Sequence, residues 1–404
     1  MTQRVTMVWI AVALSPFVFA GCSFDPHGIL NLDSLLPWRD DVPFVVPTSH
    51  SIGLVFAAPD LEVHHGQTCA KGEKTLKVHE ELAIPRRHDR GTVLLNGWWL
   101  RFADEETWVK GMGTGIGSIT VDRDLLSWDA AGEISDGSEG DVVEWCYNFT
   151  TITWSSATLA ATVDDGDTMH VFQDQAWNRG TALRPMPGFL RNPAFAGSPQ
   201  VAVLPRGFIG MWDGDSNQLL HIAYHQDAGE RFVEADKTYG NGEVPQPGPS
   251  SSAAGDVVTW ESMGFIKNDD LEWTQTFAEL VTAFAGNDVG VINPPFNVTP
   301  QEDYGIGCSS LGSPGIDSQE RIVEGVPFQF AVPVLSGWDL SYSCNDENVR
   351  QIGAWIPKWS WTPGPAGGTL RYTVSTVLEK DDHLPFFLSR SQIKILGFRR
   401  MQPR

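Results

Sequence analysis

The chain has 404 residues, of which 42% are hydrophobic and 19% charged, a composition typical of folded proteins and not of disordered ones. It contains 28 Lys and Arg against 50 Asp and Glu, and the resulting net charge of −22 disfavours nucleic acid as a partner because phosphate groups would be repelled. Its 40 Gly and 26 Pro follow no period, which excludes a collagen-like repeat and favours many turns.

The first 21 residues have the profile of a secretory signal peptide. Arg4 is their single charge, and the apolar run at 8–20 is too short to span a bilayer comfortably. The run ends in FAGC at 19–22, which resembles the lipobox of bacterial lipoproteins, although that box usually begins with Leu. The resemblance implies lipidation of Cys22, anchoring to the membrane through the lipid and, with Ser23 next, an outer-membrane location. A signal peptide cut elsewhere is the alternative.

Residues 22–45 mix Pro, Asp and Gly with short apolar stretches, and we expect a tether there. Beyond the inner membrane the compartment is oxidising, so the remaining cysteines are predicted to form disulfides. There are four of them: Cys69, Cys146, Cys308 and Cys344.

Three stretches of the chain share one pattern, at 93–113, 203–223 and 334–353. Each begins with Val-Leu and continues with a glycine and an aromatic residue. Aromatic or aliphatic residues then occupy every second position up to an acidic or amide-rich turn. The corresponding glycines are Gly97, Gly207 and Gly337, and the aromatic residues that follow them are Trp98, Phe208 and Trp338. The alternation predicts strands, and the turn residues tolerate tight-turn dihedral angles.

Further similarities extend this repeat. GDVVEW at 140–145 recurs as GDVVTW at 255–260, and 144–153 resembles 369–378. Residues 273–284 align with 154–163, and both are predicted to be strands rather than helices. The Pro/Ser-rich residues 244–256 are interpreted as a loop insertion.

The sequence therefore predicts an all-β fold of three tandem antiparallel β-sandwich modules after a signal peptide and tether. The predicted segments are 1–21 (signal peptide), 22–45 (tether), 46–165, 166–289 and 290–404 (modules). Pairing within modules predicts the disulfides Cys69–Cys146 and Cys308–Cys344. Burial of free thiols is the alternative.

A candidate cation site lies in the turn of the second module. Asp213, Asp215 and Asn217 match the first three ligand positions of a calcium loop. Gln218 and Tyr224 stand where an EF-hand needs Gly and Glu, so that loop is excluded. A plain hairpin turn is the favoured interpretation, a weaker Ca²⁺ site is the alternative, and no other cofactor is expected.

No arrangement of residues in the sequence predicts catalysis. Gly-Asp-Ser at 214–216 resembles the nucleophile block of the SGNH lipases, but the chain's one Asp-x-x-His, at 167–170, precedes it. His221 and His225 lie about 13 Å apart on a predicted strand, so they cannot share one zinc ion. The protein is therefore not expected to be an enzyme.

Tryptophan gives the remaining signal, and Trp98, Trp99 and Trp108 are the candidate ligand-binding residues. Trp98 and Trp99 must face opposite sides of a strand, so one of them can be partly exposed. For any single Trp, however, packing in the core is the favoured role. Exposed aromatic residues stack on sugars or anchor proteins. The predicted function is that of a lipid-anchored, non-enzymatic cell-envelope protein that binds a carbohydrate or a protein. A structural or assembly role as an accessory lipoprotein of an envelope machine is the alternative, and a secreted-type hydrolase is the least favoured.

Overall fold

The computed structural model describes residues 42–399, apart from 74, 103–108, 137–141, 166–169, 177–185, 199, 215–218, 220, 234–254, 268–272, 293–315, 343–348, 366 and 380–386. Twenty strands and one short 3-10 turn, Pro193–Phe195, form the secondary structure of these residues. The strands pair antiparallel, and the all-β prediction of sandwich-like modules is confirmed.

The strands form three sheets, each named here after one central strand. The β4 sheet has the order β1 (Ser49–Ala58), β2 (Leu61–Glu73), β7 (Val142–Trp154), β4 (Arg90–Phe102), β18 (Gln351–Thr362), β19 (Gly368–Glu379), β16 (Asp317–Val326). The β11 sheet has the order β3 (Thr75–Ala83), β6 (Leu125–Asp136), β5 (Val109–Asp122), β11 (Val201–Gly214), β14 (Trp273–Ala285), β8 (Thr162–Asp164), and β9 (His170–Ala176) also pairs with β14. The β17 sheet has the order β10 (Met186–Arg191), β13 (Val257–Lys267), β12 (His221–Val233), β17 (Phe330–Tyr342), β20 (Phe387–Phe398), β15 (Val289–Ile292).

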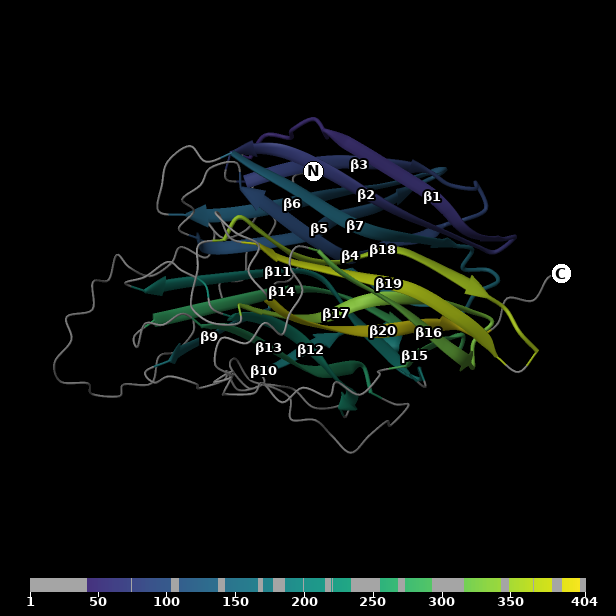
Figure 1. Cartoon of the computed structure of the whole chain (residues 1–404). Helices are drawn as coiled ribbons and strands as arrows, with labels where there is room; N and C mark the ends of the chain where they lie inside the picture. The colour runs from purple at the N-terminus through teal and green to yellow at the C-terminus, as the bar shows by residue number, and fades with distance from the viewer. Residues whose placement is uncertain are drawn as a thin grey trace, which may run out of the picture.

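One pattern of pairing occurs three times along the chain, in β2–β7, β8–β14 and β15–β20. The last four strands of each repeat, called the long strands here, are β4 to β7, β11 to β14 and β17 to β20, and in each set the first pairs with the fourth and the second with the third. The second long strand also pairs with the first long strand of the next repeat, as β5–β11, β12–β17 and β18–β4. Each sheet is therefore shared by two repeats, and the C-terminal repeat closes onto the N-terminal one (Figure 1). The second and third repeats begin with β8 and β15, and the predicted boundaries fall just after β8, at 165/166, and inside β15, at 289/290.

The three junctions between repeats have the same register. Five residues pair at each: Gly97–Arg101 with Gln351–Trp355, Gly207–Met211 with Gly111–Gly115, and Gly337–Ser341 with His221–His225. A β-bulge precedes each glycine, so the strand register passes over Asn96, Arg206 and Ser336. The predicted correspondence of the three glycines is confirmed.

Two other predicted correspondences are wrong. Residues 142–145 begin β7, the fourth long strand of its repeat, whereas 257–260 begin β13, the third long strand. In the same way, 144–153 lie in β7 and 369–378 in the third long strand, β19. Strands at different places in the repeat share the same aromatic and β-branched residue types, so local similarity does not reveal their order.

The prediction for 273–284 is confirmed, because these residues lie in β14. Residues 154–163 are instead mostly a turn that leads into the short strand β8. The insertion predicted at 244–256 lies in the connection between β12 and β13, where the corresponding connection between β5 and β6 has only two residues, 123–124.

The core of the molecule is built around three aromatic side chains, one from each sheet. The rings of Trp98, Phe208 and Trp338 have centroids 5.0, 5.1 and 5.5 Å apart, and each side chain is at most 3% exposed. Such ring pairs contribute about 0.5–1.5 kcal/mol each beyond the apolar area that they bury. The aromatic residue after each glycine thus joins all three repeats.

The glycine before each aromatic residue lets the strand of the neighbouring repeat approach. A Cβ atom on Gly97 would overlap the backbone of Trp355, and on Gly207 it would lie 2.7 Å from Gly115 Cα. On Gly337 it would lie 2.8 Å from the His225 ring. Gly97 also has a φ of +123°, which disfavours residues with a Cβ atom.

We expect Gly97→Ala to lower the free energy of unfolding by roughly 2–4 kcal/mol, because it adds backbone overlap to an unfavourable φ. Gly53→Ala is the matched control, since a Cβ atom there meets nothing within 4 Å, and it should change stability by less than about 0.5 kcal/mol. Urea denaturation measures both. Equal stability of the two variants would contradict this role of the junction.

Candidate functional site

The structure separates the three predicted tryptophans. Trp98 is 1% exposed in the aromatic core, so it offers no surface to a ligand. Its neighbour Trp99 points to the opposite side of β4 and is half-buried on the outer face of the β4 sheet. Trp108 lies outside the described residues. Trp99 is therefore the candidate around which a site can be built.

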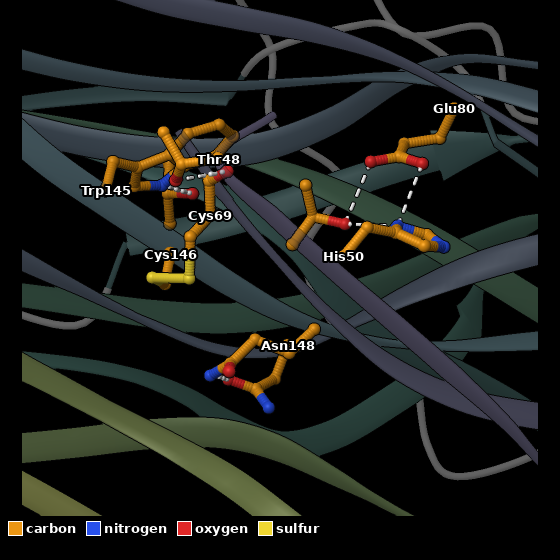
Figure 2. Close-up of a disulfide and its surroundings, with 10 residues drawn as sticks. Thr48, His50, Cys69, Glu80, Trp145, Cys146 and Asn148 are labelled. Carbon is orange, nitrogen blue, oxygen red and sulfur yellow. Dashed lines mark hydrogen bonds and ion pairs between the residues drawn. A yellow bond between two sulfur atoms is a disulfide. The ribbon is translucent and has the colours of Figure 1, made fainter. Parts of the chain in front are cut away.

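Trp99 lies beside a disulfide. Cys69 on β2 pairs with Cys146 on β7, and Cys146 in turn pairs with Trp99 on β4. The cysteines are bonded, with their Cα atoms 4.0 Å apart, which confirms the predicted Cys69–Cys146 disulfide (Figure 2). Two residues away on the same face, Gln67 Nε2 donates a hydrogen bond of 3.2 Å to Asn148 Oδ1. We call this set (Gln67, Cys69, Trp99, Cys146 and Asn148) the Trp99 face.

A row of charged and polar side chains borders the Trp99 face. Lys71, Glu144, Arg101 and Gln351 are paired in that order across four strands. Lys71 and Arg101 are exposed, whereas Glu144 and Gln351 are half-buried. The row supplies charged donors and acceptors next to an indole ring. This combination suits a ligand that has both apolar C–H faces and hydroxyl groups.

The other two repeats show that the fold does not require an aromatic residue at position 99. The same place in the junction register is taken by Ile209 in the β11 sheet and by Asp339 in the β17 sheet. The inward position one residue earlier is aromatic in all three repeats. The common core therefore accounts for Trp98, Phe208 and Trp338, whereas Trp99 lies outside that core at a position where the residue type differs between repeats.

Asp339 makes a buried contact at its own junction. Its Oδ1 atom lies 2.5 Å from His221 Nε2, and both side chains are at most 5% exposed. Burial alone would raise the pKa of Asp339, but the charge and hydrogen bond of His221 hold it below its ordinary value. This pair joins β12 to β17. His221 and His225 both lie on β12, as the predicted strand required.

A second cluster resembles a catalytic triad in composition but not in geometry. His50 Nδ1 lies 2.9 Å from Thr68 Oγ1 and 3.2 Å from Glu80 Oε2, and Thr68 Oγ1 donates to Glu80 Oε1 at 2.8 Å (Figure 2). In a working triad the hydroxyl and the carboxylate contact different nitrogens of the imidazole. Here both contact Nδ1, so the histidine cannot pass a proton between them.

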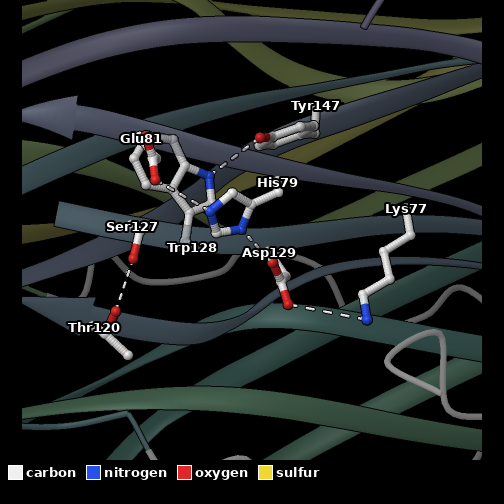
Figure 3. Close-up of polar contacts among 8 residues, drawn as sticks. All are labelled: Lys77, His79, Glu81, Thr120, Ser127, Trp128, Asp129 and Tyr147. Atoms are coloured by element: carbon white, nitrogen blue, oxygen red, sulfur yellow. Dashed lines mark hydrogen bonds and ion pairs between the residues drawn. The ribbon is translucent and has the colours of Figure 1, made fainter. Parts of the chain in front are cut away.

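A third polar cluster lies on β3 and β6. His79 Nδ1 lies 2.8 Å from Asp129 Oδ1, and His79 Nε2 lies 3.6 Å from Glu81 (Figure 3). Lys77 Nζ lies 4.0 Å from the other oxygen of Asp129 and 4.6 Å from the centre of the Phe44 ring. The hydrogen bond from Asp129 raises the pKa of His79 above its ordinary value.

Two small cavities are too small to hold a ligand. One of about 20 Å³ lies beside the aromatic core and is lined by Leu95, Pro205 and Leu335. Another of about 20 Å³ lies between β16, β19 and β20 and is lined by Asp317, Arg321 and Ser389. Each has room for about one water molecule.

The remaining predicted sites fall largely outside the described residues. This is true of Cys22, Cys308, Cys344, Asp215 and Asn217, while Asp213 is described by its backbone alone, in β11. The described residues contain no group of three His, Cys, Asp or Glu side chains placed to hold a metal ion. They also contain no helix of the length and apolarity needed to cross a membrane. The lipid, the second disulfide and the Ca²⁺ site stay predictions.

The polar neighbours of Trp99 were not predicted from the sequence, although their spacing around the two cysteines indicates them. Gln67 and Lys71 lie two residues on either side of Cys69, and Glu144 and Asn148 lie two residues on either side of Cys146. Once these cysteines are paired on adjacent strands, the alternation places all four side chains on the face that carries the disulfide.

No family model matches the chain, and neither the curated proteins nor the solved structures contain a match to it.

The raised pKa of His79 predicts a pH-dependent contribution to stability. The contribution is fully present below the pKa of an unfolded histidine, about 6.5, and is lost as the pH rises through the higher pKa of the folded state. His79→Gln should therefore lower the melting temperature more at about pH 5.5 than at about pH 9. His64→Gln is the control of opposite sign, because burial lowers the pKa of His64. The same pH trend in both variants would contradict the assignment.

Proposed function

We propose that this protein is a lipid-anchored, non-enzymatic protein of the bacterial cell envelope, in the outer membrane, and that it binds a carbohydrate at the Trp99 face. The observation that carries the proposal is the half-buried indole of Trp99, at a position where the equivalent residues are Ile209 and Asp339. An aromatic side chain that the common core does not require is available to a ligand.

Carbohydrate fits this surface better than other small ligands. The C–H groups on one face of a sugar ring stack on an indole, while its hydroxyl groups bond to carboxylate, guanidinium and amide side chains. Glu144, Arg101 and Gln351 provide these groups along one row beside Trp99. A site on the face of a sheet suits the side of an extended glycan, since the ligand does not have to enter a pocket.

The disulfide supports the proposed site and the proposed location together. It fixes β2 against β7 directly beside Trp99, so that the ring and its polar neighbours keep their relative positions. Disulfides persist in oxidising compartments, which include the periplasm and the cell surface. Both fit a chain that carries a lipobox-like FAGC ahead of its folded part.

A glycan array probed with the mature chain tests the proposal, followed by titration of the best glycan. Trp99→Ala should weaken binding by about 10- to 30-fold, the loss of roughly 1.5–2 kcal/mol of stacking. Phe189→Ala removes an aromatic residue that is 40% exposed on β10, and it should leave the affinity unchanged.

Absence of any bound glycan, or equal affinity of the two variants, would contradict carbohydrate binding at the Trp99 face. The structural or assembly role would then become the leading function.

A further inference from the structure

In the described residues the three sheets have six edges, and five of them, of which β8 and β9 share the one beside β14, are protected against pairing with another chain. β10 contains Pro187, and β15 and β8 have only four and three residues. β3, β9 and β16 carry charged residues, and β16 alone contains Asp317, Glu320, Arg321 and Glu324. Short length, proline and charge are the usual means by which a sheet edge avoids pairing with a free strand.

The sixth edge, β1, lacks all of these features. Its ten residues, SHSIGLVFAA, include no Asp, Glu, Lys, Arg or Pro, and all of them are exposed or half-buried. Its pairing with β2 is regular from Ser49 to Leu54, ahead of a bulge between Leu54 and Phe56. The regular edge is therefore about 20 Å long.

Exposed apolar side chains lie in or near the same strand. Of the six large apolar side chains exposed in the described part of the chain, Leu54 lies in β1 and Val46 three residues before it, whereas Phe44 pairs with Lys77 on β3. The exposed fractions of Val46 and Leu54 are 87% and 58%. Apolar side chains grouped around an open strand edge are typical of a protein interface.

We propose that two copies of this chain associate through β1, whose edges pair antiparallel about a twofold axis and join the two β4 sheets. A single edge provides both the donors and the acceptors for such a contact, so no second surface is needed. The chain carries a net charge of −22, and most approaches of two copies would bring carboxylates together. β1 lacks carboxylates, so the two strands can pair without a negative charge on either of them.

The contact is small. The regular edge of six residues, with the apolar side chains Ile52 and Leu54, buries less than the roughly 1,000 Å² that stable interfaces exceed. The dimer should therefore form reversibly, with a dissociation constant in the micromolar range. This inference does not depend on the lipid anchor or on carbohydrate binding.

Sedimentation velocity of the mature chain over a concentration series tests the proposal, and two matched variants locate the contact. Leu54→Lys and Ile322→Lys each place one lysine on an exposed aliphatic position, at opposite edges of the β4 sheet. Leu54→Lys should weaken the dimer by at least about tenfold, since it puts charge on the pairing edge, whereas Ile322→Lys should dimerise like the wild type. Because both residues are exposed, both variants should keep the fold, which circular dichroism checks.

A wild-type chain that stays monomeric up to about 1 mM would overturn the proposal, whatever other partner takes the edge. It would also be overturned by a dimer that both variants weaken equally, or by one that neither variant weakens.

Discussion

The fold depends on the three places where a strand of one repeat pairs with a strand of another. At each junction a bulged polar residue, a glycine and an aromatic residue follow one another, as Asn96-Gly97-Trp98 does in β4. The glycine allows the neighbouring strand to approach, and the aromatic side chain reaches the common core. The polar residue stays in the buried interior with a partner of its own: Asn96 donates to Thr150 Oγ1 at 2.6 Å, and Ser336 donates to the Gln392 carbonyl at 3.4 Å. Both hydrogen bonds lie within one repeat, whereas a repeat folded alone would lack the neighbouring strand and the other two aromatic rings.

The aromatic residue of this unit and the residue that follows it have different roles. Inward positions are aromatic in every repeat because they meet at one place, whereas the next position outward differs among Trp99, Ile209 and Asp339. The outward residue has a different role in each sheet. Asp339 joins two strands through His221, and Trp99 lies beside a disulfide with its ring partly exposed. The repeat thus provides a stable frame on which one face carries the candidate binding surface.

Much of this architecture could be predicted from the sequence, for physical reasons. Period-2 alternation and turn residues marked the strands, and the Gly-aromatic pair identified the three repeats because close approach and core packing restrict both residues strongly. The exchange of strands between repeats could not be predicted, since a strand that pairs within its own repeat and one that pairs with the next have the same alternation. The burial of a charged side chain could not be predicted from the sequence either. Glu279 is 1% exposed and accepts hydrogen bonds from Tyr224 and Trp260, yet nothing local distinguishes it from a surface glutamate.

Calorimetry of the mature chain tests the central claim, that the repeats share their sheets and fold as one unit. If each sheet takes strands from two repeats, no repeat can unfold without exposing its neighbours. The account predicts a single transition whose calorimetric enthalpy equals its van 't Hoff enthalpy. Two or three separate transitions, each with its own melting temperature, would show that the repeats unfold independently and would contradict the account.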